Sequence, residues 1–189
     1  ELLRYQFGPD HPYQPIRFQL IRDTLREMDV FDDRLVYVES PSATEDDLRE
    51  VHEESLINYV KELSRIGTGY LDMGDTPVCH GLFEGALAAV GATLHGAECI
   101  ARGEYDHVMT PGGGLHHARR DKSAGFSVFN DLAVAVRRLQ RKYGYERVAV
   151  IDIDGHHGDG TQSIFNGERI LTISFHRYGA GFYPGTGAA

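Results

Sequence analysis

Apolar side chains recur every three or four positions along several stretches of the chain, and this spacing predicts amphipathic helices. The residue types at the ends of these stretches agree with that interpretation. Thr44 is a suitable N-cap for one helix and Asn130 or Asp131 for another, while Gly103 and Gly144 are suitable stops. We therefore predict helices over residues 16–28, 44–66, 83–102 and 130–143.

Two short apolar runs without polar alternation, at 148–151 and 170–173, predict strands. Unbroken runs of this kind are typical of parallel strands that helices bury on both faces. Residues 35–38 and 107–110 are further strand candidates. Because helices and strands alternate along the chain, we predict an α/β fold with a parallel sheet sandwiched by helices.

The composition indicates one folded domain. With 189 residues, of which 41% are hydrophobic, and no repeat or linker, residues 1–189 are expected to form a single α/β domain. The net charge of −9 argues against nucleic acid or an anionic membrane as a partner, and no stretch reaches the ~18 apolar residues of a membrane span. Two cysteines without a CxxC pair argue against a disulfide framework, so a cytoplasmic protein is expected. A homo-oligomer is compatible with this composition.

Ten histidines and 22 glycines are the unusual part of the composition, and several of them follow the predicted strands. Asp152, Asp154 and His156 are two positions apart, so an extended chain would turn them to one side and Ile153 to the core. Oxygen and nitrogen donors without sulfur suit a catalytic Zn²⁺, Fe²⁺ or Mn²⁺. The alternative is a solvated loop, but so many ionisable groups in one short run favour a cation or mutual pairing.

A second candidate, His116-His117, follows three glycines after the predicted strand at 107–110. Adjacent histidines can serve one site only from an irregular loop, and that arrangement suits general acid–base catalysis. Asp152 and Asp159 are carboxylates available to orient the two imidazoles. No GxxxxGK[ST] or GxSxG motif is present and no GxGxxG opens a helix, so neither nucleotide binding nor serine hydrolase chemistry is supported.

These residues also carry a resemblance. The chain resembles the histone deacetylase superfamily, and within it a prokaryotic acetoin-utilization-type deacetylase, through several motifs that occur in the same order. The motifs are residues 10–17, the helix from Val51-His52 to Tyr59-Val60, Gly114-Leu115-His116-His117-Ala118, residues 125–131, residues 152–160 and Pro184-Gly185-Thr186-Gly187. The resemblance implies an arginase/deacetylase-type α/β fold.

The resemblance also implies roles for the residues that match. Asp154 and His156 would ligate a catalytic Zn²⁺, or Fe²⁺, that polarises the acyl carbonyl and activates water. His117 would be the general base and then the acid toward the leaving amine, with His116 mainly electrostatic, and Asp152 and Asp159 would orient them. The implied substrate is an acyl amide: acetyl-lysine, an acetylpolyamine or a small acetylated amine.

Further residues take roles by the same resemblance. A structural monovalent-cation site, usually K⁺, would comprise Asp152, Ser174 and the backbone oxygens of Asp154, His156 and Phe175. The acyl-lysine channel would be walled by Gly125, Phe126 and Tyr183, with Asp75 at its rim and Arg17 at its inner end.

Two departures from the family pattern accompany the resemblance. Leu115 stands where many eukaryotic members have an aromatic residue. The second carboxylate ligand and the carbonyl-polarising tyrosine of the family have no counterpart in this sequence, so we expect an incomplete, truncated domain with weak metal affinity and little activity. Two alternatives stay open at this point: a binuclear manganese ureohydrolase of the arginase type, and a non-catalytic module that binds an acyl ligand or a metal.

Overall fold

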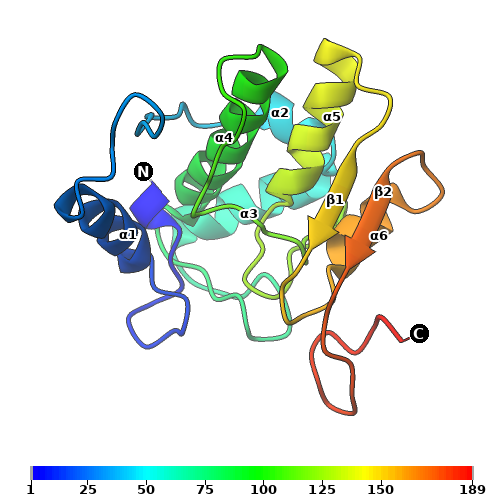
Figure 1. Cartoon of the computed structure of the whole chain (residues 1–189). Coiled ribbons are helices and arrows are strands. Elements are labelled where there is room, and N and C mark those ends of the chain that lie inside the picture. Colours follow the sequence, from blue (N-terminus) through cyan, green and yellow to red (C-terminus); the bar gives the residue numbers. More distant parts are fainter. Residues whose placement is uncertain (1, 189) are drawn as a thin grey trace.

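The computed structural model of the chain describes residues 2–188, and its elements form a helical layer beside a small parallel sheet (Figure 1). Helices α4 and α5 run side by side, and β1, β2 and α6 lie together at one side of the molecule. In chain order the elements are η1 (Leu2–Arg4), α1 (Ile16–Glu27), α2 (Glu45–Arg49), α3 (Glu54–Ile66), α4 (Leu82–Ala101), α5 (Asp131–Tyr143), β1 (Ala149–Asp152), α6 (Asp159–Phe165) and β2 (Leu171–Ser174).

Three of the predicted helices are confirmed as α1, α4 and α5. Helix α5 begins after Asn130, whose side chain accepts the Ala133 N–H, and it ends at Gly144 in the left-handed conformation. Both ends therefore follow the local capping chemistry that the sequence indicated.

The predicted helix over 44–66 is wrong in one respect, because the structure divides it into α2 and α3. Thr44 caps α2 through a reciprocal pair of hydrogen bonds with Asp47. The chain then turns between the two helices and buries His52, which is only 4% exposed. The His52 ring bonds to the backbone at Arg119 and Asn130, and these long-range contacts hold the turn.

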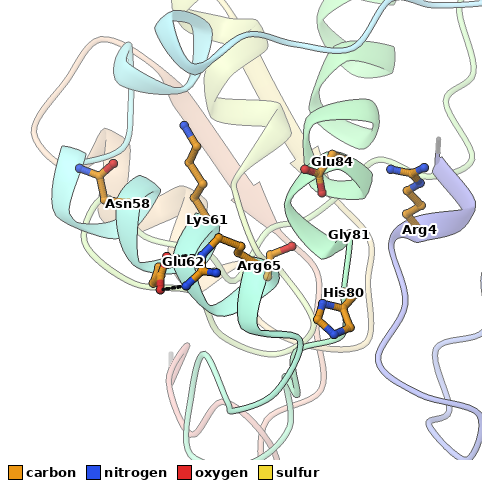
Figure 2. A pocket seen from close by; sticks show the side chains of 9 residues that line it. Arg4, Asn58, Lys61, Glu62, Arg65, His80, Gly81 and Glu84 are labelled. Atoms are coloured by element: carbon orange, nitrogen blue, oxygen red, sulfur yellow. Dashed lines mark hydrogen bonds and ion pairs between the residues drawn. The ribbon is translucent and has the colours of Figure 1, made fainter.

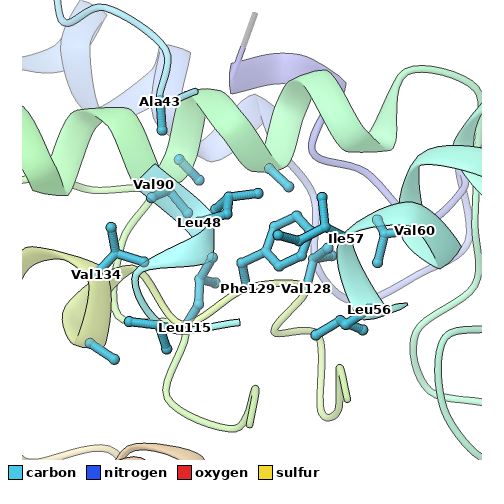
Figure 3. Close-up of a cluster of buried hydrophobic side chains, with 14 of the residues drawn as sticks. Ala43, Leu48, Leu56, Ile57, Val60, Val90, Leu115, Val128, Phe129 and Val134 are labelled. Atoms are coloured by element: carbon cyan, nitrogen blue, oxygen red, sulfur yellow. The ribbon is translucent and has the colours of Figure 1, made fainter. Parts of the chain in front are cut away.

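The apolar core lies between the helices and the loop that precedes α5 (Figure 3). Helices α2, α3, α4 and α5 each contribute buried aliphatic side chains to it. Phe129 at the end of that loop is fully buried and meets the Phe83 ring edge to face. Figure 3 shows a part of this cluster around Leu48, Ile57, Val90, Phe129 and Val134.

The two predicted strands are confirmed as a parallel pair, with Ala149 opposite Leu171 and Asp152 opposite Ser174. Their predicted burial on both faces is wrong. Ile151 is 62% exposed and Leu171 56% exposed, because no helix among residues 2–188 covers that face of the sheet. Ile153, which we expected to turn to the core, is likewise exposed.

The other two strand candidates are also wrong. Residues 35–38 and 107–110 are irregular in the structure. Val36 and Tyr37 are exposed, and no strand in the described part of the chain pairs with them. No helix among the described residues is long and apolar enough to cross a membrane.

Candidate active site at the ends of the strands

Two histidine–carboxylate pairs lie beyond the carboxyl ends of the strands. His116 Nδ1 is 2.6 Å from Asp152 Oδ2, and His117 Nδ1 is 2.7 Å from Asp159 Oδ1. The two rings are tilted against each other with their centroids 4.0 Å apart. The structure thus brings together all four residues expected to act in acid–base catalysis. Each carboxylate accepts the Nδ1–H of its histidine, so Nε2 is the ring nitrogen left without a carboxylate partner in either pair.

The loop before the histidines is shaped by Asp131, the first residue of α5. Its carboxylate is fully buried and accepts hydrogen bonds from the N–H groups of Gly114 (3.0 Å) and Leu115 (2.7 Å) and from the Thr93 hydroxyl (2.5 Å). Burial raises the pKa of Asp131 above its ordinary value, although these hydrogen bonds oppose the shift. The N-terminal end of α5 favours the ionised form of the Asp131 carboxylate, as these hydrogen bonds do. Asp131 therefore fixes the backbone from which the tandem histidines project.

The two pairs differ electrostatically. Burial tends to lower the pKa of His116, but the hydrogen bond and charge of Asp152 outweigh burial, so this pKa lies above its ordinary value. The pKa of His117 lies below its ordinary value because burial lowers it, the Asp159 hydrogen bond only partly opposes that, and His116 lowers it further. Asp159 also binds Arg119 at 2.8 Å, so two partners share its charge. His117 is therefore the ring better suited to stay neutral.

Asp154 and His156 lie next to the first pair. Asp154 Oδ1 is 2.9 Å from His156 Nδ1 and 3.9 Å from His116 Nε2, and both residues are partly exposed. Carboxylate and imidazole are donor types that suit Zn²⁺ or Fe²⁺. The described residues contain no group of three or more His, Cys, Asp or Glu side chains placed to bind a metal. A catalytic zinc site takes three protein ligands, so these residues fit such an ion in kind but supply only two of its donors.

The residues expected to bind a monovalent cation are only partly gathered. Asp152 and Ser174 line a cavity of about 20 Å³ between the two strands and α6, which has room for one water or ion. Asp154 and His156 do not line it. Phe175 is 66% exposed, and its N–H donates to the Asp152 carbonyl.

Two of the expected channel residues, Tyr183 and Gly125, lie against His117 of the second pair. The Tyr183 ring meets the His117 ring edge to face, with centroids 4.9 Å apart. A Cβ at Gly125 would lie 2.6 Å from His117 Cδ2, so only glycine permits this approach. Phe126 follows in an unusual conformation with φ of +66°.

The other two substrate-side residues lie further out. Asp75 is exposed, and its carbonyl binds His11 Nε2 at 3.1 Å. Arg17 is exposed in α1 with its guanidinium 4.2 Å from the centre of the Tyr13 ring. The structure therefore does not bring Arg17 to the histidines.

Several residues that organise the site were not identified from the sequence. Besides Asp131 they include Asp72, whose carboxylate accepts the Gly125 N–H at 3.1 Å. His157, the neighbour of His156, points elsewhere and binds Thr186 and Gln162. An acidic residue at a helix start or in a Gly-rich turn is visible in the sequence, but such residues also have purely local roles, so neither position indicated a functional site.

A cavity of about 710 Å³, lined in part by His80, lies between η1, α3 and the start of α4, and neither His116 nor His117 lines it (Figure 2). Its lining mixes cationic and anionic side chains, and among them Arg65 pairs with Glu62 at 2.7 Å. Charge at this cavity therefore favours no ligand class.

Comparison with known proteins agrees with this geometry. The family "Histone deacetylase domain" matches residues 11–189. The acetoin utilization protein AcuC of Bacillus subtilis is 38% identical over 97% of this chain and 49% of its own length. A probable deacetylase of Archaeoglobus fulgidus is 38% identical over 99% of this chain and 52% of its own length. This chain spans about half the length of these relatives.

The fold comparison gives the same result. The crystal structure of the HDA15 HD domain superposes with a TM-score of 0.87 at 34% identity, covering 100% of this chain and 54% of that one. The architecture is thus an incomplete arginase/deacetylase α/β fold, as expected. These relatives do not favour the arginase alternative. The chain belongs to the histone deacetylase family.

Proposed function

We propose that the protein is a metal-dependent deacetylase that hydrolyses an acyl amide of an amine such as acetyl-lysine, an acetylpolyamine or a small acetylated amine. The observation that carries the proposal is the tandem pair His116–Asp152 and His117–Asp159, set beside Asp154 and His156. Two imidazoles held by separate carboxylates next to two metal-type donors suit hydrolysis better than binding alone.

In this proposal His117 moves the proton. Its Nδ1–H donates to Asp159, so Nε2 accepts a proton from the water that attacks the acyl carbon. The lowered pKa of His117 keeps the ring neutral and ready for this step near neutral pH. His117 then gives the proton to the nitrogen of the leaving amine, and the products are acetate and the free amine.

His116 has a different part. The hydrogen bond and charge of Asp152 hold its pKa up against burial, so it carries more positive charge than His117 at the same pH. Positive charge on this ring, whose centroid is 4.0 Å from that of His117, would stabilise negative charge as it develops on the acyl oxygen. We assign His116 this electrostatic part.

Asp154 and His156 would hold the metal as two of its ligands. When bound, Zn²⁺ or Fe²⁺ supplies Lewis-acid chemistry that polarises the acyl carbonyl and lowers the pKa of water. We assign K⁺, as a structural ion, to the small cavity that Asp152 and Ser174 help to line.

The substrate enters along Gly125, Phe126 and Tyr183 in this proposal. Phe126 and Tyr183 are aromatic walls that suit the apolar methylene stem of a lysine or polyamine, and the contact of Tyr183 and Gly125 with His117 brings the acyl group to the base. Asp75 at the exposed rim would bind the substrate backbone or amine.

The test measures metal content and acetate release with the full-length protein. After removal of bound metal, we expect Zn²⁺ or Fe²⁺ to bind at one ion per chain and to restore acetate release from an acetyl-lysine peptide or an acetylated diamine. Asp154→Ala should lose tight metal binding, whereas Asp33→Ala, at an exposed site, should keep it. Metal-independent binding of acetylated amines without acetate release would refute the proposal and support a non-catalytic module.

A further inference from the structure

Two consecutive residues of the channel wall adopt left-handed backbone conformations. Gly125 has φ of +52° and Phe126 has φ of +66°. Glycine adopts this region freely, but a phenylalanine does so rarely. Such a residue persists only where its surroundings hold it by several contacts. Contacts from two other segments hold Phe126 in this conformation.

Polar contacts from the 72–76 loop supply part of the answer. The Gly125 N–H donates to Asp72 Oδ2 at 3.1 Å, and the Phe126 N–H donates to Thr76 Oγ1 at 3.1 Å. The Thr76 hydroxyl in turn donates to Asp72 Oδ2 at 2.5 Å. Thr76 is fully buried, so water cannot replace its oxygen. Both N–H groups of the left-handed pair are thus bound by one side-chain unit.

Contacts on the other side come from the start of the chain. The Tyr5 hydroxyl donates to the Phe126 carbonyl at 2.6 Å and accepts the Val128 N–H at 3.0 Å. The His11 ring meets the Phe126 ring edge to face at 4.6 Å, and its Nε2 donates to the Asp75 carbonyl. The Tyr13 N–H donates to Nδ1 of His11, which fixes the proton on Nε2. The 72–76 loop, which carries the rim residue Asp75, and the channel wall at Gly125 and Phe126 are therefore one connected unit.

This connected unit holds the backbone that lies next to His117 of the catalytic pair. A Cβ at Gly125 would meet His117 Cδ2 at 2.6 Å and the Tyr183 hydroxyl at 2.8 Å, so the backbone at Gly125 is in tight contact with both side chains. A shift of the left-handed pair by about one ångström would change the width of the channel and the pose of the acyl group.

We propose that Asp72 and Thr76 are positioning residues that set the width of the acyl channel by holding Gly125 and Phe126 in their left-handed conformations, with Gly125 against His117 and Tyr183. The inference rests on the proposed deacetylase function and extends it to how the site selects a narrow, unbranched acyl-amine stem. Neither residue touches His116 or His117, so the effect of losing them falls on substrate binding more than on proton transfer.

The first experiment compares Thr76→Val with Thr76→Ser in the full-length, metal-loaded protein. Valine has nearly the shape of threonine but cannot accept the Phe126 N–H, whereas serine retains the hydroxyl. We expect Thr76→Val to raise KM for an acetyl-lysine peptide roughly tenfold with little change in kcat, and Thr76→Ser to stay near the wild type. Equal effects of the two variants, or a wild-type KM for Thr76→Val, would overturn the proposal.

The second experiment needs no activity. A 4-fluorophenylalanine at position 126 reports its surroundings through the ¹⁹F chemical shift. Thr76→Val and Asp72→Asn should each move or broaden this signal, and Thr76→Ser and the exposed control Asp33→Asn should not. Melting curves show which variants fold. If Thr76→Val does not fold, Asp72→Asn takes its place in this test.

The two experiments separate this inference from the proposed function. A ¹⁹F signal that is unchanged in folded Thr76→Val or Asp72→Asn refutes the positioning role even if the wild type is an active deacetylase. A wild type that releases no acetate refutes the proposed function, while a displaced ¹⁹F signal still supports the positioning of Phe126.

Discussion

Protonation of His52 should destabilise this protein, because the folded structure favours the neutral ring. His52 Nδ1 donates to the Arg119 carbonyl at 2.9 Å, and Nε2 accepts the Asn130 N–H at 3.0 Å. A proton on Nε2 would face that N–H directly. Burial lowers the pKa of His52 from 6.5 to about 4, although the backbone hydrogen bond to Arg119 opposes the shift.

The magnitude follows from the two pKa values. Between pH 6.5 and about 4 the unfolded chain binds a proton that the folded chain excludes, so the free energy of unfolding falls as the pH falls. This contribution is fully present above pH 6.5, and roughly 3 kcal/mol of it is lost by pH 4, at about 1.4 kcal/mol for each pH unit. Between pH 7.5 and pH 5.0 the expected loss through His52 is about 2 kcal/mol.

The assay is urea unfolding at both pH values, followed by circular dichroism. His52→Gln should be less stable than the wild type at pH 7.5, because the amide does not reproduce both hydrogen bonds. It should also lose about 2 kcal/mol less stability on going to pH 5.0, because the titrating group is gone. His80→Gln, at an exposed position, is the matched control and should keep the wild-type pH dependence. The reasoning is refuted if His52→Gln and the wild type lose the same free energy between the two pH values.

Three further substitutions test other parts of the account. Asp131→Ala leaves the N–H groups of Gly114 and of buried Leu115 without this acceptor and should lower the free energy of unfolding by about 3 kcal/mol in urea titrations; a change below about 1 kcal/mol would contradict its organising role. Gly125→Ala adds a Cβ that collides with His117 and should reduce acetate release by at least about tenfold in the full-length protein, with wild-type rates as the contrary result. Arg138→Met removes the ion pairs that join α5 to α2 and α4 and should cost about 2 kcal/mol by thermal melting, and an unchanged melting temperature would oppose it.

The helices could be predicted where local chemistry decides them. In α5 the apolar spacing, the N-cap and the terminal glycine agree and the structure follows them, and in α4 the apolar spacing and Gly103 predict where the helix ends. The break between α2 and α3 could not be predicted, because apolar residues continue at helical spacing across it. Its cause is the contact of His52 with Arg119 and Asn130, far along the chain.

The strands show a different limit. Unbroken apolar runs correctly predicted the parallel pairing of β1 and β2. The same runs predicted cover on both faces, and here Ile151 and Leu171 are exposed. A run of apolar residues indicates that a strand is suited to be covered by other elements on both faces. The pattern does not show that a covering element is present.

The site was predictable where its residues follow a strand. Asp152, Asp154 and His156 come at alternating positions at and after the end of β1, and His116 reaches Asp152 from an irregular loop. Asp72 and Asp131 were missed because each acts on backbone groups elsewhere in the chain. The Asp72 partner Gly125 is 53 residues away, and no local pattern encodes that contact.

The central claim is that His117 is the proton carrier of a metal-dependent deacetylase. The most direct test is acetate release from an acetyl-lysine peptide by the metal-loaded, full-length wild type and by its His117→Ala and His80→Ala variants. We predict that His117→Ala lowers kcat by about a hundredfold or more while metal content stays unchanged, and that His80→Ala keeps the wild-type rate. A His117→Ala protein that retains its metal and releases acetate at the wild-type rate would contradict the account.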